Sequence, residues 1–228
     1  MTHPPVELPR KVATEFVGTA FLVTAVVGSG VMATRLSDDV GVQLLENSIA
    51  TGAVLVALIL ALQPVSAAFN PVVTLIEAAV GELRMAAAAA LIAAQVAGGF
   101  LGAVAANVMF ELPAVELSTH DRGGAGLWIA EVIATFGLVV IIFGSARAGR
   151  IDTIAFAVGG YIAAAYWFTS STSFANPAVT VARMFSDTFA GIAPASAPAF
   201  VFAQLLGGAA GLVFVRAVFP NSSPLEHS

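Results

Sequence analysis

Two Asn-Pro steps, at Asn70-Pro71 and Asn176-Pro177, have the residue types and spacing that could select a small molecule. Asparagine is a strong helix N-cap, and proline at the first helical position loses no hydrogen bond, so each step predicts the start of a helix. Each step lies inside a charge-free window, 47–76 or 153–182, and each window is 30 residues long. Because one membrane crossing needs only about 20 residues, we expect each window to hold a full crossing followed by a half-helix that begins near mid-membrane.

The chemistry expected of these two steps is the selection of neutral solutes. The amino ends of the half-helices would meet near the membrane centre, where their dipoles repel cations and protons. Each capping asparagine keeps a side-chain NH2 that can donate a hydrogen bond to the oxygen of a passing solute. One isolated Asn-Pro step is most often a simple turn. Two steps at matched positions favour a pore, since irregular backbone at membrane depth is tolerated where it lines a watery cavity.

The composition indicates that the chain is embedded in a membrane. Hydrophobic residues make up 58% of the 228 residues, charged residues only 10%, and the mean hydropathy is +0.93, so the chain cannot stay soluble alone. Windows with at most one charge recur at 12–34, 47–76, 85–110, 123–146, 153–182 and 188–215. These windows predict an all-α membrane protein with six transmembrane helices and two re-entrant half-helices.

The two halves of the chain repeat one another. Pairs that share an offset of 106 are Glu46 with Asp152, Asn70 with Asn176, Thr74 with Thr180, and Glu77 with Arg183. Pairs nearer the start of each half share an offset of 116 residues, and pairs nearer the end of each half share an offset of 109 residues. We expect these differences to lie in loops, with a connection after the first helix ten residues longer than its counterpart. Three crossings in each half, an odd number, make the two repeats inverted.

The windows also predict the organisation of the chain. We expect a cytoplasmic tail at 1–11, a first repeat at 12–110, an extracellular loop at 111–122, a second repeat at 123–218 and a cytoplasmic tail at 219–228. The half-helices are expected at about 70–80 and about 176–186. With both termini inside the cell, six basic residues lie on the cytoplasmic side and three outside, as basic residues usually distribute. We expect a multi-pass protein of the cell membrane, which in a bacterium is the inner membrane.

Over nearly its whole length the sequence resembles the aquaporin family of channels. Two segments carry the resemblance: residues 66–74, Ser-Ala-Ala-Phe-Asn-Pro-Val-Val-Thr, and residues 174–180, Phe-Ala-Asn-Pro-Ala-Val-Thr. The family signature is a pair of Asn-Pro-Ala boxes. The second box, Asn176-Pro177-Ala178, is intact, and the first, Asn70-Pro71-Val72, has valine in its third position. The resemblance implies that both boxes lie at the pore midplane, and that the chain forms a homotetramer in membrane lipid with one pore in each subunit.

The resemblance also implies a filter. Aquaporins narrow on the outer side at four side chains, one of them an arginine directly after the second box. The corresponding residues here are Thr51 (or Ala50), Ala164 with an uncertainty of one residue, Ser173 and Val179. Small side chains and the missing arginine imply a wider, less polar filter, as in a bacterial branch of the family linked to arsenic resistance. We therefore expect a passive channel for water and larger neutral solutes, such as glycerol or undissociated metalloid hydroxides like arsenite; a strict water channel is the alternative.

Three charged residues in the predicted membrane segments need a role. Glu15 and Glu131 resemble the paired glutamates of the family, which accept hydrogen bonds from the loops that lead into the half-helices; a proton relay is the alternative. Arg183 follows Val179 by one helical turn, about 6 Å further out. We expect Arg183 either to guard the outer mouth or to pair with Asp187 at the surface.

Other classes of function fit the sequence less well. An ion-coupled secondary transporter also uses inverted repeats, but it needs a titratable residue near the binding site, and none neighbours Asn70 or Asn176 in the sequence. The chain has no cysteine, and its three histidines lie in tails or loops, so nothing indicates an enzyme, a cofactor or a metal site. The net charge of -5 is dispersed and gives no reason to expect a nucleic acid partner. A structural membrane-junction protein is a third class that the sequence leaves open.

Overall fold

The computed structural model describes residues 6–219, which form eight α-helices and contain no strand. Six of these helices are long and apolar enough to cross a membrane: α1 (Leu8–Leu36), α2 (Val40–Leu62), α4 (Met85–Met109), α5 (Ala125–Arg147), α6 (Ile154–Phe168) and α8 (Ala197–Val218). A 3₁₀ turn at Ile151–Thr153 precedes α6. The predicted all-α class with six transmembrane helices is confirmed.

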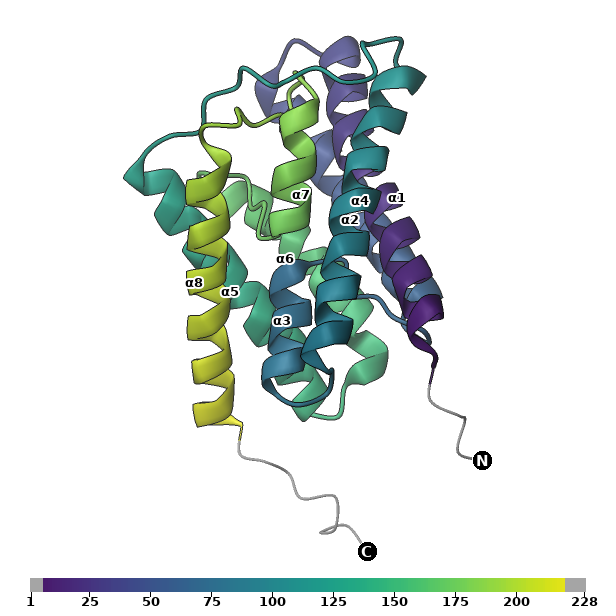
Figure 1. The fold of residues 1–228 in the computed structure, drawn as a ribbon. Helices are drawn as coiled ribbons and strands as arrows, with labels where there is room; N and C mark the ends of the chain where they lie inside the picture. Colours follow the sequence, from purple (N-terminus) through teal and green to yellow (C-terminus); the bar gives the residue numbers. More distant parts are fainter. Residues whose placement is uncertain (1–5, 220–228) are drawn as a thin grey trace, which may run out of the picture.

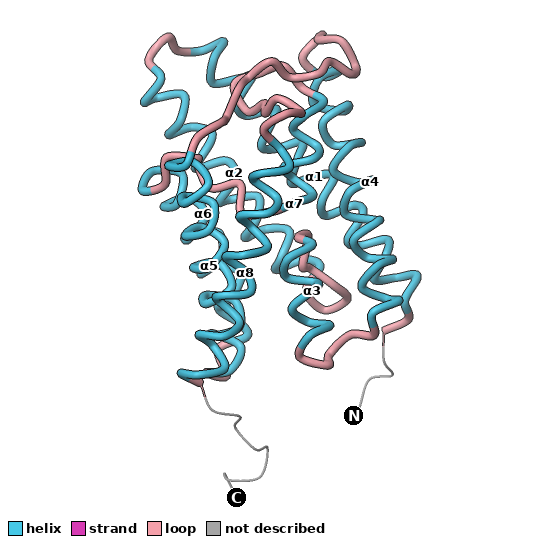
Figure 2. Tube along the Cα trace, turned by 60° about the vertical axis from the view of Figure 1, so that its left-hand side comes forward, coloured by secondary structure: helices cyan, strands magenta, loops and turns pink. Residues whose placement is uncertain are grey.

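Two short helices lie inside this bundle and run away from each other (Figure 1). They are α3 (Pro71–Ala79) and α7 (Pro177–Ala182), and a 3₁₀ turn at Arg183–Phe185 continues α7. Figure 2 shows in pink the loops that lead into them through the bundle. Helix α1 begins and α8 ends at the lower end of Figure 1, here called the termini side, and the connection 110–124 crosses the opposite end, here called the loop side.

The long helices pack in pairs that the repeat relates to each other. Helix α1 lies against α4, and α5 lies against α8. A Cβ atom on Gly98 of α4 would collide with the backbone oxygen of Phe16, and one on Gly207 of α8 would collide with that of Val132. Only glycine permits these close approaches, a common device where helices must associate within lipid. The two pairs form opposite walls around the short helices.

The connection after the first helix differs from the sequence prediction. Only residues 37–39 join α1 to α2, so the predicted long loop is wrong. The extra residues lengthen helices instead: α1 has 29 residues against 23 in α5, and α2 has 23 against 15 in α6. Asp39 explains the early start of α2, because its side chain accepts a hydrogen bond from the backbone N–H of Val42 at 3.0 Å and caps the helix ahead of the apolar window.

The last apolar window, 188–215, is only partly helical. Helix α8 begins at Ala197, and the preceding residues form a loop on the loop side. The chain from Arg183 to this loop pairs with the connection 110–124: the backbone N–H of Ser118 donates to Met184 at 2.9 Å, and that of Ala193 donates to His120 at 2.8 Å. This pairing holds the carboxyl end of the second short helix in a fixed place.

Candidate functional site

The two box asparagines cap the short helices and tie their amino ends together. The Oδ1 of each asparagine accepts a hydrogen bond from the backbone N–H two residues on, at 3.0 Å. The Nδ2 of Asn70 donates to the carbonyl oxygen of Ala175 at 2.8 Å, and that of Asn176 donates to Phe69 at 2.7 Å. The sequence predicted free NH2 groups, but each gives one of its two hydrogens to the opposite loop. One hydrogen of each group is left for a solute.

Two fully buried glutamates hold the loops that enter the short helices. Glu15 accepts hydrogen bonds at 2.5 to 2.8 Å from Ser66 Oγ and from the backbone N–H groups of Ala68 and Phe69. Glu131 accepts the equivalent set at 2.6 to 2.9 Å from Ser171 Oγ and from the backbone N–H groups of Phe174 and Ala175. Neither glutamate lines the cavity described below, so the geometry favours loop support over a proton relay.

Each glutamate is tied in turn to a short helix through a buried glutamine. Gln95 donates from Nε2 to Glu15 and to Thr74 Oγ1, both at 2.8 Å. Gln204 donates to Glu131 at 2.7 Å and to Thr180 Oγ1 at 2.8 Å. The two networks match position for position, so both repeats position their asparagine in the same way.

The third box residues, Val72 and Ala178, are buried but do not line the cavity. Val72 faces Gly208 of α8, where an added Cβ would collide with its side chain. Ala178 lies near Gly99 of α4, where an added Cβ would lie 3.3 Å from its backbone oxygen. The absent side chain of Gly208 therefore makes room for valine where the family signature has alanine.

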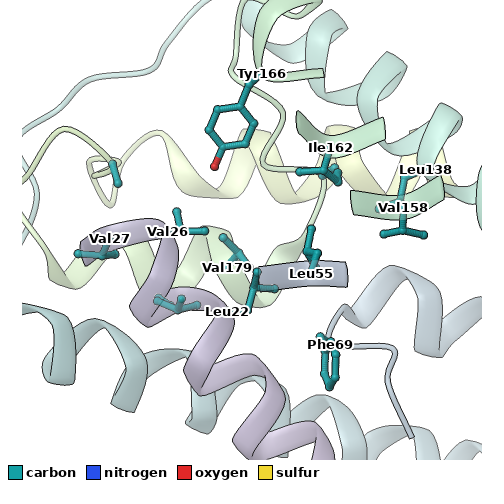
Figure 3. Close-up of a cluster of buried hydrophobic side chains, with 14 of the residues drawn as sticks. Leu22, Val26, Val27, Leu55, Phe69, Leu138, Val158, Ile162, Tyr166 and Val179 are labelled. Atoms are coloured by element: carbon teal, nitrogen blue, oxygen red, sulfur yellow. The ribbon is translucent and has the colours of Figure 1, made fainter. Parts of the chain in front are cut away.

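A cavity of about 450 Å³ passes both asparagines and extends toward each end of the bundle. Towards the termini side its lining includes Lys11, Glu77 and Glu82, and towards the loop side it includes Arg183. Between these ends the wall is largely apolar, and Figure 3 shows several of its residues: Leu22, Val26, Leu55, Phe69, Leu138, Val158, Ile162, Tyr166 and Val179.

Three of the four expected filter residues line this cavity on the loop side of the asparagines: Thr51, Ser173 and Val179. All three are buried. The Oγ of Ser173 is buried without a hydrogen-bond partner among the described residues, and Thr51 Oγ1 lies 3.1 Å from the hydroxyl of Tyr166. Polar oxygens and the apolar side chain of Val179 therefore lie in the same part of the cavity.

The fourth expected filter residue, Ala164, is not in the cavity. It is exposed on the outer surface of α6, whereas Tyr166, two residues further on, is buried and lines the cavity. Figure 3 shows the Tyr166 hydroxyl pointing into the group that contains Val26 and Val179. Two residues turn a helix by about 200°, so an alignment error of two places selects the opposite face. The sequence carried no signal that selects Tyr166, since Tyr161 is a second tyrosine in the same helix and its hydroxyl donates to Ala134 of α5 instead of facing the cavity.

Arg183 is buried and lines the cavity on the loop side. Its guanidinium carbon lies 3.4 Å from the centre of the Phe174 ring, and its Nε donates to the carbonyl oxygen of Ala190. The suggested surface pairing with Asp187 is wrong, because the Asp187 carboxylate instead accepts from Thr119, at 2.8 Å from its backbone N–H. Arg183 is thus directed toward the cavity and not toward the surface.

Arg122 supports this arrangement from the connection 110–124. Its guanidinium also lies over Phe174, 5.1 Å from the ring centre, and its Nε donates to Gly191 at 2.8 Å. Burial lowers the pKa of Arg122 to about 10, so this side chain stays charged at neutral pH. Two arginines therefore share one aromatic ring on the loop side.

Comparisons with known proteins agree with this geometry. The family model described as Major intrinsic protein matches residues 4–151. The chain is 46% identical to aquaglyceroporin AqpS from Rhizobium meliloti (strain 1021) over 220 residues, which make up 96% of this chain and 94% of that protein. The structure of the aquaglyceroporin from Plasmodium falciparum matches with a TM-score of 0.74 and 18% identity, over 93% of this chain and 97% of that one. At 18% identity the structural likeness concerns the fold alone.

Proposed function

Because the chain belongs to the major intrinsic protein family, we propose that it is a passive channel for water and small neutral solutes such as glycerol. The observation that carries the proposal is the cavity that passes Asn70 and Asn176, the caps of two short helices whose amino ends meet. Partial positive charge at these ends repels cations, while a neutral molecule can accept a hydrogen bond from either asparagine and pass. Such a protein is a channel and not an enzyme.

The filter that we propose consists of Thr51, Tyr166, Ser173 and Val179. The hydroxyl groups of the first three supply donors and acceptors, and Val179 supplies an apolar wall. A molecule with hydroxyl groups along one edge and carbon atoms along the other suits both parts of such a filter. Since valine is smaller than the arginine usual at position 179 in the family, glycerol-sized molecules and neutral metalloid hydroxides such as arsenite are included among the solutes.

Two other functions agree less well with the site. A strict water channel needs a narrower, more polar constriction than valine provides at position 179. An ion-coupled transporter needs a titratable group at its solute site. The charged residues that line the cavity, Lys11, Glu77, Glu82 and Arg183, lie towards its two ends and not beside the asparagines.

Transport measurements on the purified protein in vesicles test the proposal. Vesicles that contain the wild-type protein should change volume in osmotic gradients and in gradients of glycerol or arsenite. The solute flux should not respond to a proton gradient. Val179→Arg should lower glycerol and arsenite flux much more than water flux, because it adds volume and donors that water can use. Val179→Ala, the control, should keep or raise glycerol flux.

The result that would overturn the filter assignment is an unchanged ratio of glycerol to water permeability in Val179→Arg. Equal amounts of protein must be compared, since an arginine in this position can also impair folding. A flux that follows the proton gradient would favour a coupled transporter. The absence of any solute flux would favour a structural membrane-junction protein.

Further proposals concern assembly and placement. The chain is a multi-pass membrane protein, and exposed apolar side chains on its outer surface, such as Phe21 and Phe202, suit contact with lipid or with other subunits. We propose a homotetramer in the cell membrane, with the termini side in the cytoplasm as the basic residues predict. Native mass spectrometry and reporter fusions to each terminus would test these two points.

A further inference from the structure

Glu77 stands on α3 where the repeat places Arg183 after α7. Three positions of each half line the cavity in the same order: Asn70, Val73 and Glu77 from the first half, and Asn176, Val179 and Arg183 from the second. The two half-helices run in opposite directions from the midplane (Figure 1). The repeat therefore puts a carboxylate in the termini-side mouth and a guanidinium in the loop-side mouth.

The charge of Glu77 is not neutralised by a bonded partner. Within residues 6–219 its carboxylate accepts no hydrogen bond and forms no ion pair, while its side chain is half-buried at the cavity wall. Lys11 and Glu82 line the same mouth, and Glu15 on α1 is the third charged group that acts on Glu77. When both carboxylates on its wall are ionised, they outnumber the one ammonium, and this mouth carries a net negative charge.

An anion and a cation meet different barriers in such a pore. The half-helix ends at Asn70 and Asn176 are positive, so they repel cations but attract anions. Arg183 adds to this attraction on the loop side. Among the described residues that line the cavity, Glu77 and Glu82 are the ones that can repel an anion, and Glu82 is exposed, where solvent screens its charge.

We propose that Glu77 is the anion barrier of this channel. Its carboxylate excludes small anions at the termini-side mouth, while the half-helix ends and Arg183 exclude cations, so that only neutral molecules meet no charge barrier in either direction. This role rests on the proposed channel function, and it assigns to one side chain a discrimination that the asparagine boxes cannot supply.

The experiment measures chloride and nitrate flux alongside glycerol flux at mildly alkaline pH, where Glu77 is ionised, in vesicles that contain the wild-type protein, Glu77→Gln or Glu82→Gln. Glu77→Gln keeps the size of the side chain and removes its charge, so anion flux relative to glycerol flux should rise by about tenfold or more. Glu82→Gln is the matched control in the same mouth and should raise it much less. Glu77→Asp keeps the charge and should exclude anions as the wild type does.

An anion flux in Glu77→Gln equal to that of the wild type, with glycerol flux intact, would overturn the anion barrier and leave the channel function standing. An equal rise in Glu82→Gln would overturn the specific role of Glu77. Absence of glycerol flux in the wild type would instead overturn the channel function on which the proposal rests. If Glu77→Gln does not reach the membrane, Glu77→Ala provides the same comparison.

Discussion

At the scale of single residues, the outer part of the pore depends on the side chain of Tyr166. Its hydroxyl lies 3.1 Å from Thr51 Oγ1, which links α6 to α2 across the cavity. Its ring fills space that an alanine would leave open. The constriction is therefore narrower on this side than a filter of four small residues would be, and selection by size does not rest on Val179 alone.

Truncation of this ring should widen the pore. Tyr166→Ala should raise glycerol permeability severalfold relative to water, because it removes the bulkiest proposed filter side chain. Ala164→Leu is the control, since Ala164 is exposed on the outer surface of α6 and should tolerate a larger apolar side chain. Stopped-flow light scattering on vesicles measures both permeabilities. If the ratio of glycerol to water permeability changes in Ala164→Leu and not in Tyr166→Ala, Ala164 lines the pore and Tyr166 does not.

At the scale of elements, the half-helices depend on the loops that lead into them. Phe69 and Ala175, the residues before the asparagines, both have φ of 48°, in the left-handed region that residues other than glycine rarely adopt. The hydrogen bonds to Glu15 and Glu131 hold both residues in this conformation. The carboxylate of Glu15 on α1 thus fixes the position of Asn70, and the carboxylate of Glu131 on α5 fixes the position of Asn176.

Removal of one carboxylate should destabilise the fold. Glu131→Ala leaves two buried backbone N–H groups and the Ser171 hydroxyl without their acceptor, at a cost of about 1 to 3 kcal/mol for each group. The thermal unfolding temperature in detergent should fall, and solute flux per folded protein should fall with it. Glu116→Ala, a change on the exposed connection, should leave both unaltered. If Glu131→Ala unfolds at the same temperature as the wild type, Glu131 does not support the loop.

The packing of α1 against α4 should respond to the size of one residue. Gly98→Leu would push a side chain into the backbone of α1 near Phe16, and overpacking of this kind costs about 1 to 3 kcal/mol or more. The yield of folded protein in a size-exclusion assay should drop. Gly160→Leu on α6 is the control, because no atom lies within 4 Å of an added Cβ there. Equal yields of the two variants would mean that the close approach is not required.

At the scale of the whole molecule, the inverted repeats bring two helix amino ends to one point. Neither half can build this site alone, because each asparagine donates to the loop of the other half. Two partial positive charges then face the same short stretch of the cavity. The charge pattern along the pore follows: positive at the centre and at Arg183, and negative at the termini-side mouth.

A carboxylate at the centre should weaken the barrier to cations. Asn176→Asp places a negative charge between the two positive helix ends, and sodium leak through vesicles should rise by about tenfold or more. Asn176→Ser is the control, since serine also caps a helix but adds no charge. Fluorescent reporters of sodium and pH measure the leak. Unchanged cation exclusion in a folded Asn176→Asp protein would argue against the electrostatic account.

The sequence by itself determined what depends on local chemistry. Hydrophobic runs of membrane length fixed the six crossings, and the Asn-Pro steps fixed where α3 and α7 begin, at Pro71 and Pro177, because capping involves only neighbouring residues. The repeated offset of 106 indicated that the two halves adopt the same arrangement. These features are visible in the order of residues along the chain and need no knowledge of three-dimensional contacts.

Only the tertiary structure decided which side chains meet in the pore. Tyr166 lines the cavity in place of Ala164 because α6 packs against α2 with the Tyr166 hydroxyl 3.1 Å from Thr51 Oγ1. The position of Arg183 depends on Phe174 and on the carbonyl oxygen of Ala190, and Val72 fits beside Gly208. The contacts of Tyr166 with α2 and of Val72 with α8 join residues far apart in the chain, so three-dimensional packing decides them and local preference does not.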